Sequence, residues 1–197
     1  MKVKMQRCST IVILGEPNAG KSTLLNALIK EKIAPVHSKP QMTRKNLLGI
    51  LTEGDHQLIF VDTPGLHVSK QKFNQYLLKD LELMLSGADV VLLLLDVEHE
   101  FPEILTQKLE QIKDKRIFMV MNKIDLAKGS QADDKIDYWK DLIGFSHVIK
   151  VSALEKLHTE DLFEMIIDAL PEHPPYFPKD SLTDKPERFF VDEMITE

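Results

Sequence analysis

The tightest constraint on the fold of this chain is an eight-residue loop with the sequence Gly15-Glu16-Pro17-Asn18-Ala19-Gly20-Lys21-Ser22. A β-rich apolar run at residues 10–14 comes before it, and residues 21–30 follow with leucines at helical spacing. The loop matches the pattern G-x-x-x-x-G-K-[ST], which is meaningful between a strand and a helix. Glycines let the backbone turn tightly at such a junction. The sequence therefore predicts a strand, a closely wrapped loop and a helix as one unit.

The rest of the chain alternates short apolar runs with segments of helical period. Residues 46–52 and 57–61 favour two strands, and the turn between them predicts a hairpin. We expect further strands at 88–96, 116–121 and 147–151, and helices at 73–85, 102–112, 133–143 and 159–170. Continuous apolar runs are typical of parallel strands covered on both faces. The predicted fold class is α/β, with a doubly wound, mostly parallel sheet.

Composition excludes several classes of protein. The 197 residues suit a domain of ordinary size, and the single cysteine, Cys8, indicates a reducing, cytoplasmic setting. The formal net charge of -6 argues against a non-specific coat for nucleic acid, because phosphate binding draws on lysine and arginine. The most apolar run, residues 90–95, is far shorter than the roughly 20 residues of a membrane helix.

Proline changes the character of the chain after Leu170. Four prolines fall within residues 171–178, which predicts a stiff, extended linker over residues 171–185. Residues 186–197 have apolar pairs four apart and favour the start of a helix. We therefore divide the chain into a domain at 1–170, a linker at 171–185 and the beginning of a second unit at 186–197.

The chemistry of the glycine loop points to phosphate. Its backbone N–H groups and the helix N-terminus are suited to phosphate oxygens. Lys21 is expected to reach the β- and γ-phosphates, and the Ser22 hydroxyl to bind Mg²⁺. We expect the whole run from Gly15 to Thr23 to contact a nucleotide. The loop alone does not distinguish GTP from ATP.

Asn122-Lys123-Ile124-Asp125 supplies that distinction. The four residues end a buried strand, where open α/β sheets bind ligands. An ionised Asp125 accepts both adjacent donors of guanine, N1–H and the N2 amine, whereas adenine offers no matching donor. We expect Asn122 to bridge the base and the phosphate loop, and the stem of Lys123 to cover the base plane. A helix cap by Asp125 is the alternative interpretation.

Two further segments are expected at the phosphates. Asp62-Thr63-Pro64-Gly65 ends a strand, so Asp62 is placed to hold Mg²⁺ and the Gly65 N–H to contact the γ-phosphate. Thr43, in the basic stretch of residues 37–45, is expected to complete the Mg²⁺ shell, although Ser38 and Thr52 compete with it by spacing. Val151-Ser152-Ala153 follows the last strand and offers backbone N–H groups to guanine O6; a plain strand ending is the alternative.

Together these segments resemble the Era-like family of translation-factor-related GTPases. The resemblance rests on GEPNAGKSTLLNALI, KPQMTRKNLLGILTEG, VDTPGLH, MNKIDL and PYFPKDSLTDKPERFFVDEMI, and it covers nearly the whole chain. It implies a six-stranded sheet with about five flanking helices, slow Mg²⁺-dependent hydrolysis of GTP, and action in assembly of the small ribosomal subunit and maturation of its rRNA. By position, Thr43 is the first-switch threonine, and Asp62 to Gly65 form the second switch.

The resemblance also implies a C-terminal KH-type RNA-binding domain, of which residues 186–197 look like the first helix. The GXXG loop of such a domain is absent from these 197 residues, so we expect a truncated KH domain here and rRNA binding through the missing part. Whether the native chain continues past Glu197 is open. We expect a monomer, and peripheral association with the inner face of the cell membrane stays open.

Hydrolysis of GTP by this chain is expected to need a group that the chain itself does not supply. Leu66 follows Gly65, where Ras-type enzymes place a water-orienting glutamine, and an apolar side chain cannot orient water. Asn18 resembles an asparagine that helps hold K⁺ near the phosphates in related GTPases, so we expect K⁺ to take the place of an arginine finger. A role of Asn18 in the conformation of the loop alone is the alternative. The expected catalytic residues are Lys21, Thr43, Asp62, Gly65 and Asn18. A nucleotide-dependent scaffold with negligible turnover, and a GTPase of another branch, are the competing interpretations.

Overall fold

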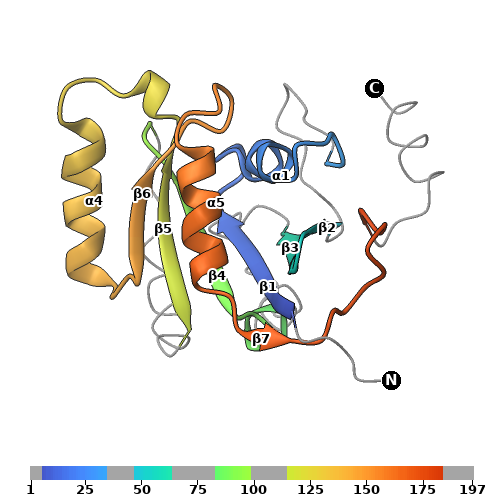
Figure 1. The fold of residues 1–197 in the computed structure, drawn as a ribbon. Coiled ribbons are helices and arrows are strands. Elements are labelled where there is room, and N and C mark those ends of the chain that lie inside the picture. Colours follow the sequence, from blue (N-terminus) through green and yellow to red (C-terminus); the bar gives the residue numbers. More distant parts are fainter. Residues whose placement is uncertain (1–5, 35–46, 64–82, 99–114, 184–197) are drawn as a thin grey trace, which may run out of the picture.

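The computed structural model describes residues 6–34, 47–63, 83–98 and 115–183. Six strands of one sheet follow the order β2-β3-β1-β4-β5-β6, and a two-residue seventh strand, β7 (Glu172–His173), pairs with β1 off this path (Figure 1). Their bounds are β1 Gln6–Gly15, β2 Leu47–Glu53, β3 His56–Asp62, β4 Val90–Asp96, β5 Arg116–Asn122 and β6 His147–Lys150. Strands β3, β1, β4, β5 and β6 are parallel, and β2 runs antiparallel to β3. The mostly parallel six-stranded sheet with an early hairpin is thereby confirmed.

Helices lie on both faces of the sheet. The structure describes α1 Lys21–Ile29, a 3-10 turn η1 Ile124–Leu126, α4 Gln131–Leu142 and α5 Thr159–Asp168. These confirm the helices expected at 21–30, 133–143 and 159–170, whereas η1 was not expected. Residues 83–86 are helical, and the rest of the helix expected at 73–85, together with that at 102–112, lies outside the described residues.

The centre of the sheet is apolar on both faces because each face meets a different layer of helices. Ile11 and Ile13 of β1 join a buried cluster with α1 and α5, including Leu24 and Leu162. Their alternating neighbours Val12 and Leu14 join a second cluster with α4, including Ile136 and Trp139. Successive side chains of a strand point to opposite faces. A strand of this kind therefore buries every residue, as β4 does.

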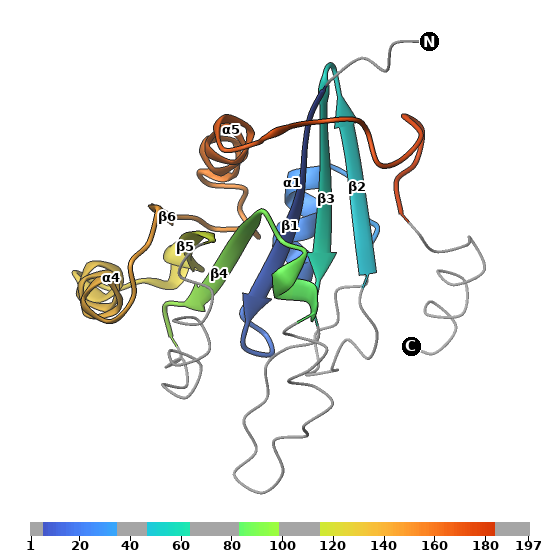
Figure 2. The same ribbon diagram turned by 90° about the horizontal axis from the view of Figure 1, so that it is seen from below.

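Residues 171–183 lie against the sheet, and we call them the strap. The strap begins with β7, Glu172–His173, which pairs antiparallel with the start of β1. It then runs past β3 to the open edge of β2, as Figures 1 and 2 both show. There Ile50 N–H donates to Leu182 O at 2.8 Å, and Thr183 forms a bridge with Gly49. The part of the expected linker that the structure describes is thus bonded to the sheet near its start and at its end.

One buried side chain holds the middle of the strap. Gln57, at the start of β3, is completely buried. Its Oε1 accepts the N–H groups of Tyr176 and Phe177 at 2.7 and 2.9 Å, and its Nε2 donates to Phe177 O at 2.9 Å. Nε2 also donates to Thr52 Oγ1 at 3.1 Å. A buried amide is stable only when such bonds are made, so Gln57 fastens the strap to the sheet.

Candidate functional site

Several residues singled out from the sequence meet at one edge of the sheet, where Asp96 joins them. Gly15, Asp62, Asp96 and Asn122 end β1, β3, β4 and β5, and Asp96 lies opposite Asn122 in the β4–β5 register. After β1 the chain passes to β2 and β3 on one side, and β4 to β6 lie on the other side. Open α/β sheets bind ligands beyond the carboxyl ends of their strands at such a reversal of order.

The glycine loop between β1 and α1 has no room for side chains at two positions. A Cβ on Gly15 would lie 2.6 Å from Leu94 O, and one on Gly20 would lie 2.4 Å from Asn122 Nδ2. Gly20 also has a φ of 95°, in the left-handed region that favours glycine. Asn18 has a φ of 65° and is exposed. The loop is therefore packed tightly against β4 and β5 and presents Asn18 outward.

Lys21, the first residue of α1, turns its side chain back into the loop. Its Nζ donates to Glu16 O at 2.7 Å and to Gly15 O at 3.2 Å. The residue is 6% exposed, and burial lowers the pKa of its ammonium to about 8, against the opposing effect of the Asp62 and Glu16 charges. A buried ammonium in a loop of this kind offers a strong site for an anion, because little water competes for it.

Ser22 and Asp62 lie side by side from different elements. Ser22 Oγ donates to Asp62 Oδ2 at 2.7 Å, and among the described residues Asp62 Oδ1 is buried without a hydrogen-bond partner. Burial raises the pKa of the Asp62 carboxyl, while the bond from Ser22 and the charge of Lys21 oppose this. A hydroxyl and an incompletely paired carboxylate fit Mg²⁺, which prefers oxygen ligands. The described residues contain no group of three or more His, Cys, Asp or Glu placed to hold a metal.

Asn122 joins the phosphate loop to the segment after β6. Its Nδ2 donates to Ala19 O at 2.7 Å, and its Oδ1 accepts the N–H of Ala153 at 3.0 Å. The side chain is 2% exposed. Three segments that are far apart in sequence are thus held together by one amide.

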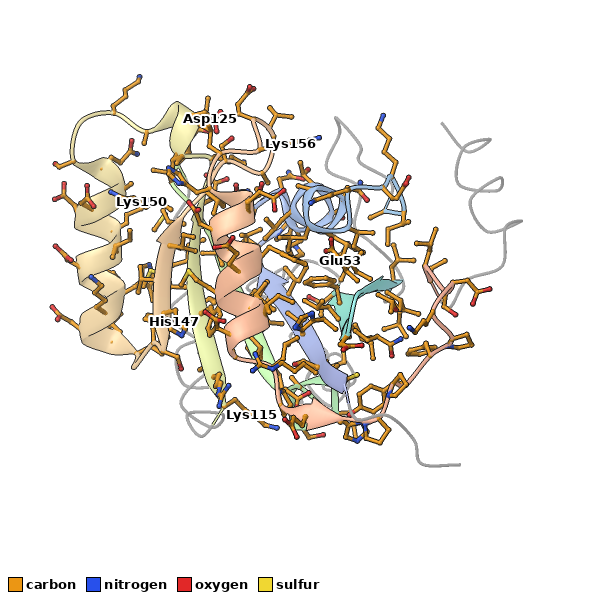
Figure 3. The ribbon with its side chains drawn as sticks, in the orientation of Figure 1. Glu53, Lys115, Asp125, His147, Lys150 and Lys156 are labelled. Carbon is orange, nitrogen blue, oxygen red and sulfur yellow. The ribbon has the colours of Figure 1, made fainter. Side chains whose placement is uncertain are left out.

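Lys123 and Asp125 lie at the same edge of the sheet, beyond the end of β5. Lys123 adopts a φ of 62°, and its Nζ contacts Asp96 Oδ2 at 2.5 Å. Asp125 lies on η1 and is exposed. Figure 3 shows Asp125 at the end of the molecule that also carries Lys156 of the loop before α5. The carboxylate of Asp125 is therefore open to a ligand at this edge.

The three backbone N–H groups expected to meet guanine O6 are already bonded to protein. Val151 N–H donates to Met121 O, Ser152 N–H to Leu157 O, and Ala153 N–H to Asn122 Oδ1. A contact with O6 from this segment has to share or replace one of these bonds. The amino-acid pattern could not show this, because the bond from Ala153 depends on Asn122, 31 positions away.

Other expected residues are placed as follows. Thr23 is in the first turn of α1, and Thr63 is buried with its Oγ1 donating to Ile13 O at 2.8 Å. Four candidates lie outside the described residues, namely Thr43, Pro64, Gly65 and Leu66. Asp96 was not expected in the site. Within the described part of the chain, no helix has the length and apolarity needed to cross a membrane.

Comparisons with known proteins agree with this geometry. A family model described as 50S ribosome-binding GTPase matches residues 10–123. The chain is 40% identical over 195 residues to GTPase Era of Clostridium kluyveri, covering 98% of this chain and 67% of that protein.

Two crystal structures share the fold. One is Era in complex with MgGDPNP and nucleotides 1506–1542 of 16S ribosomal RNA, with a TM-score of 0.83 and 30% identity over 96% of this chain and 66% of that one. The other is Aquifex aeolicus Era, in an alanine-for-tyrosine variant bound to GDP and AlF4⁻, with a TM-score of 0.84 and 31% identity over 96% and 65%. This chain spans about two thirds of the length of these relatives.

Proposed function

The chain belongs to the Era-like GTPases, and on that premise we propose that it is a GTP-driven switch in assembly of the small ribosomal subunit and maturation of its rRNA. The observation that carries the proposal is the amide of Asn122, bonded to Ala19 of the phosphate loop and to Ala153. It makes the phosphate loop and the base-reading segments one site. A nucleotide bound there meets both parts at once.

At the phosphate end, the proposed roles follow from burial and charge. The Lys21 ammonium pairs with the β- and γ-phosphates, replacing the carbonyl oxygens of Gly15 and Glu16 that it now contacts. Ser22 and Asp62 would hold Mg²⁺, which supplies positive charge against the charge that develops during phosphoryl transfer. Neutralising Asp62 in this way removes the penalty of burying its carboxylate. Thr43 keeps its proposed place in the Mg²⁺ shell, and the Gly65 N–H its proposed contact with the γ-phosphate.

At the base end, Asp125 is proposed to accept guanine N1–H and N2–H. The carboxylate of Asp125 is exposed, and Asp125 lies inside η1, whose N-cap position is occupied by Lys123; both observations support the base-reading role over that of a helix cap. A base lacking one donor leaves the carboxylate incompletely paired, which weakens binding by about 1.5–3 kcal/mol for a charged acceptor. The stem of Lys123 lies next in sequence and is proposed to cover the base plane.

The hydrolysis step is proposed to use K⁺ beside Asn18. Asn18 is exposed in the phosphate loop, which supports an outward-facing role at the phosphates. We expect phosphate release to be faster in KCl than in NaCl, and Asn18→Ala to remove the difference. Equal rates in both salts, with the variant unchanged, contradict the role of K⁺.

The partner is proposed to be small-subunit rRNA, because one Era structure holds nucleotides of 16S ribosomal RNA. We propose that residues 1–170 form the GTPase domain, 171–185 connect it, and 186–197 begin a KH-type domain that carries most of the RNA contact. Sequencing the gene beyond Glu197 tests this organisation. The RNA proposal is tested by sedimenting the gene product with small subunits in the presence of GTP or GDP, where binding should depend on the nucleotide.

The enzymatic proposal is tested by phosphate release from GTP with Mg²⁺, beside binding of GDP and ADP. We expect turnover with GTP, and preference for GDP over ADP. Tight GTP binding without phosphate release would instead support the scaffold interpretation. Equal affinity for GDP and ADP would contradict the base-reading roles of Asn122 and Asp125.

A further inference from the structure

Asp96, the last residue of β4, is a buried carboxylate beside the site that the roles above do not use. Its side chain is 4% exposed. Oδ2 accepts from Lys123 Nζ at 2.5 Å, and Oδ1 accepts the N–H of Glu98 at 2.8 Å. A carboxylate at this depth is stable only when it is paired and hydrogen-bonded. Asp96 and Lys123 therefore form a fixed contact between β4 and the end of β5.

The chain changes direction at Lys123, between β5 and η1, and we call this residue the elbow of the base-reading segment. Its φ of 62° and ψ of 36° are left-handed, and this residue separates Asn122 at the end of β5 from η1, which carries Asp125. A non-glycine residue in this region is strained, and it persists only where the surroundings hold it. The direction in which Asp125 leaves the sheet depends on this one backbone conformation.

Backbone bonds fix the residues on either side of the elbow. Val97 N–H donates to Asn122 O at 3.3 Å, Ile124 N–H to Val151 O at 3.2 Å, and Leu126 N–H to Lys123 O at 2.9 Å. None of these restrains the Lys123 side chain. In the described part of the chain, the carboxylate of Asp96 is the group that does so.

We propose that Asp96 is a positioning residue for guanine recognition. By holding the Lys123 ammonium against the end of β4, Asp96 keeps the backbone of Lys123 left-handed. This places the Asp125 carboxylate where it can accept from guanine. Asp96 also keeps the Lys123 stem extended along the edge of the site. The inference rests on the proposed function, since it assumes that Asp125 reads guanine.

The test compares GDP with IDP, whose base lacks the N2 amine. Both share the same phosphates, so the ratio of their dissociation constants reports base reading alone. We expect Asp96→Asn to reduce the preference for GDP by about tenfold, the scale of one hydrogen bond to a charged group. Asp89→Asn is the matched control, because Asp89 precedes the other end of β4 and bonds to Ser9 and Thr10 of β1. The control should keep the wild-type ratio.

A double variant separates positioning from general loosening. Lys123→Met removes the same contact from the other side, so Asp96→Asn should add nothing to the loss of preference in that background. An additive loss would show that Asp96 acts other than through Lys123 and would overturn the proposal. If Asp96→Asn does not fold, Asp96→Glu replaces it. Its longer arm displaces the carboxylate, and we expect a partial loss of about threefold.

The outcomes distinguish the two levels of inference. A wild-type chain without preference for GDP over IDP contradicts the proposed base reading itself. A wild-type preference that survives intact in a folded Asp96→Asn or Asp96→Glu variant contradicts only the role of Asp96.

Discussion

Replacing Lys21 by methionine should change how the stability of the nucleotide-free chain depends on pH. In the folded chain, burial lowers the pKa of Lys21 from 10.5 to about 8. Between these two values the unfolded chain holds a proton that the folded chain has released. Stability of the wild type therefore rises with pH through this window, and the contribution disappears when Lys21 is removed.

The magnitude follows from the two pKa values. The contribution of one group is RT times the logarithm of (1 + 10^(pH−8))/(1 + 10^(pH−10.5)). It is close to zero at pH 7 and reaches about 2 kcal/mol at pH 9.5. For a chain of this size, that corresponds to about 4–8 °C in melting temperature. As the pH is raised from 7 to 9.5, the free energy of unfolding of the wild type should increase by this amount relative to that of Lys21→Met.

Urea unfolding at both pH values measures the effect, with nucleotide and metal removed beforehand. Other titrating groups are common to both proteins and cancel in the difference. Lys32→Met, at an exposed lysine beyond α1, is the control and should run parallel to the wild type. If the difference between wild type and Lys21→Met stays constant from pH 7 to 9.5, the ammonium does not titrate as burial requires and the reasoning is refuted.

Three further substitutions test the site. Asp62→Asn should abolish the Mg²⁺ dependence of GTP affinity. Because burial raises the pKa of Asp62, its ionisation destabilises the fold as pH rises, so the variant should be more stable than wild type at pH 7 without Mg²⁺; a less stable variant would contradict this. Gly20→Ala should lower stability by at least about 1–2 kcal/mol, from its left-handed φ and the clash with Asn122, measured by urea unfolding. Asp125→Asn should weaken GDP binding by about 10–100-fold and shift preference towards xanthosine nucleotides, and unchanged GDP affinity would refute its base-reading role.

The strands and helices of this fold were predictable because their signals are local. Apolar runs such as residues 90–95 remain buried on both faces, and the leucines of α1 keep their spacing toward the sheet. The first and last residues of the strands and helices were less predictable. β1 starts at Gln6, four positions before its apolar run, because residues 6–9 pair with β3 and β7 rather than being apolar themselves.

The residue types of the candidate site could be singled out from the sequence, but not their contacts. The patterns around Gly15 and Asn122 pointed to both segments, and the structure brings them together. Asp96 carries no pattern of its own, and it is placed by the β4–β5 register opposite Asn122. The requirement for glycine at position 20 likewise has a cause 102 positions away, in the amide of Asn122. Such reasons depend on packing between distant segments, which periodicity does not encode.

The strap illustrates the same limit and has a consequence for the site. Prolines predicted its extended backbone, but not its attachment, because Gln57 lies 119 and 120 positions before the two N–H groups that it binds. The strap reaches β2 at Gly49 and Ile50, close to Leu47, whose partner in β3 is Asp62. Strand β2 is thus hydrogen-bonded on both sides, to β3 and to the strap. Whatever follows residue 183 therefore starts beside a strand that is in register with the proposed Mg²⁺ ligand.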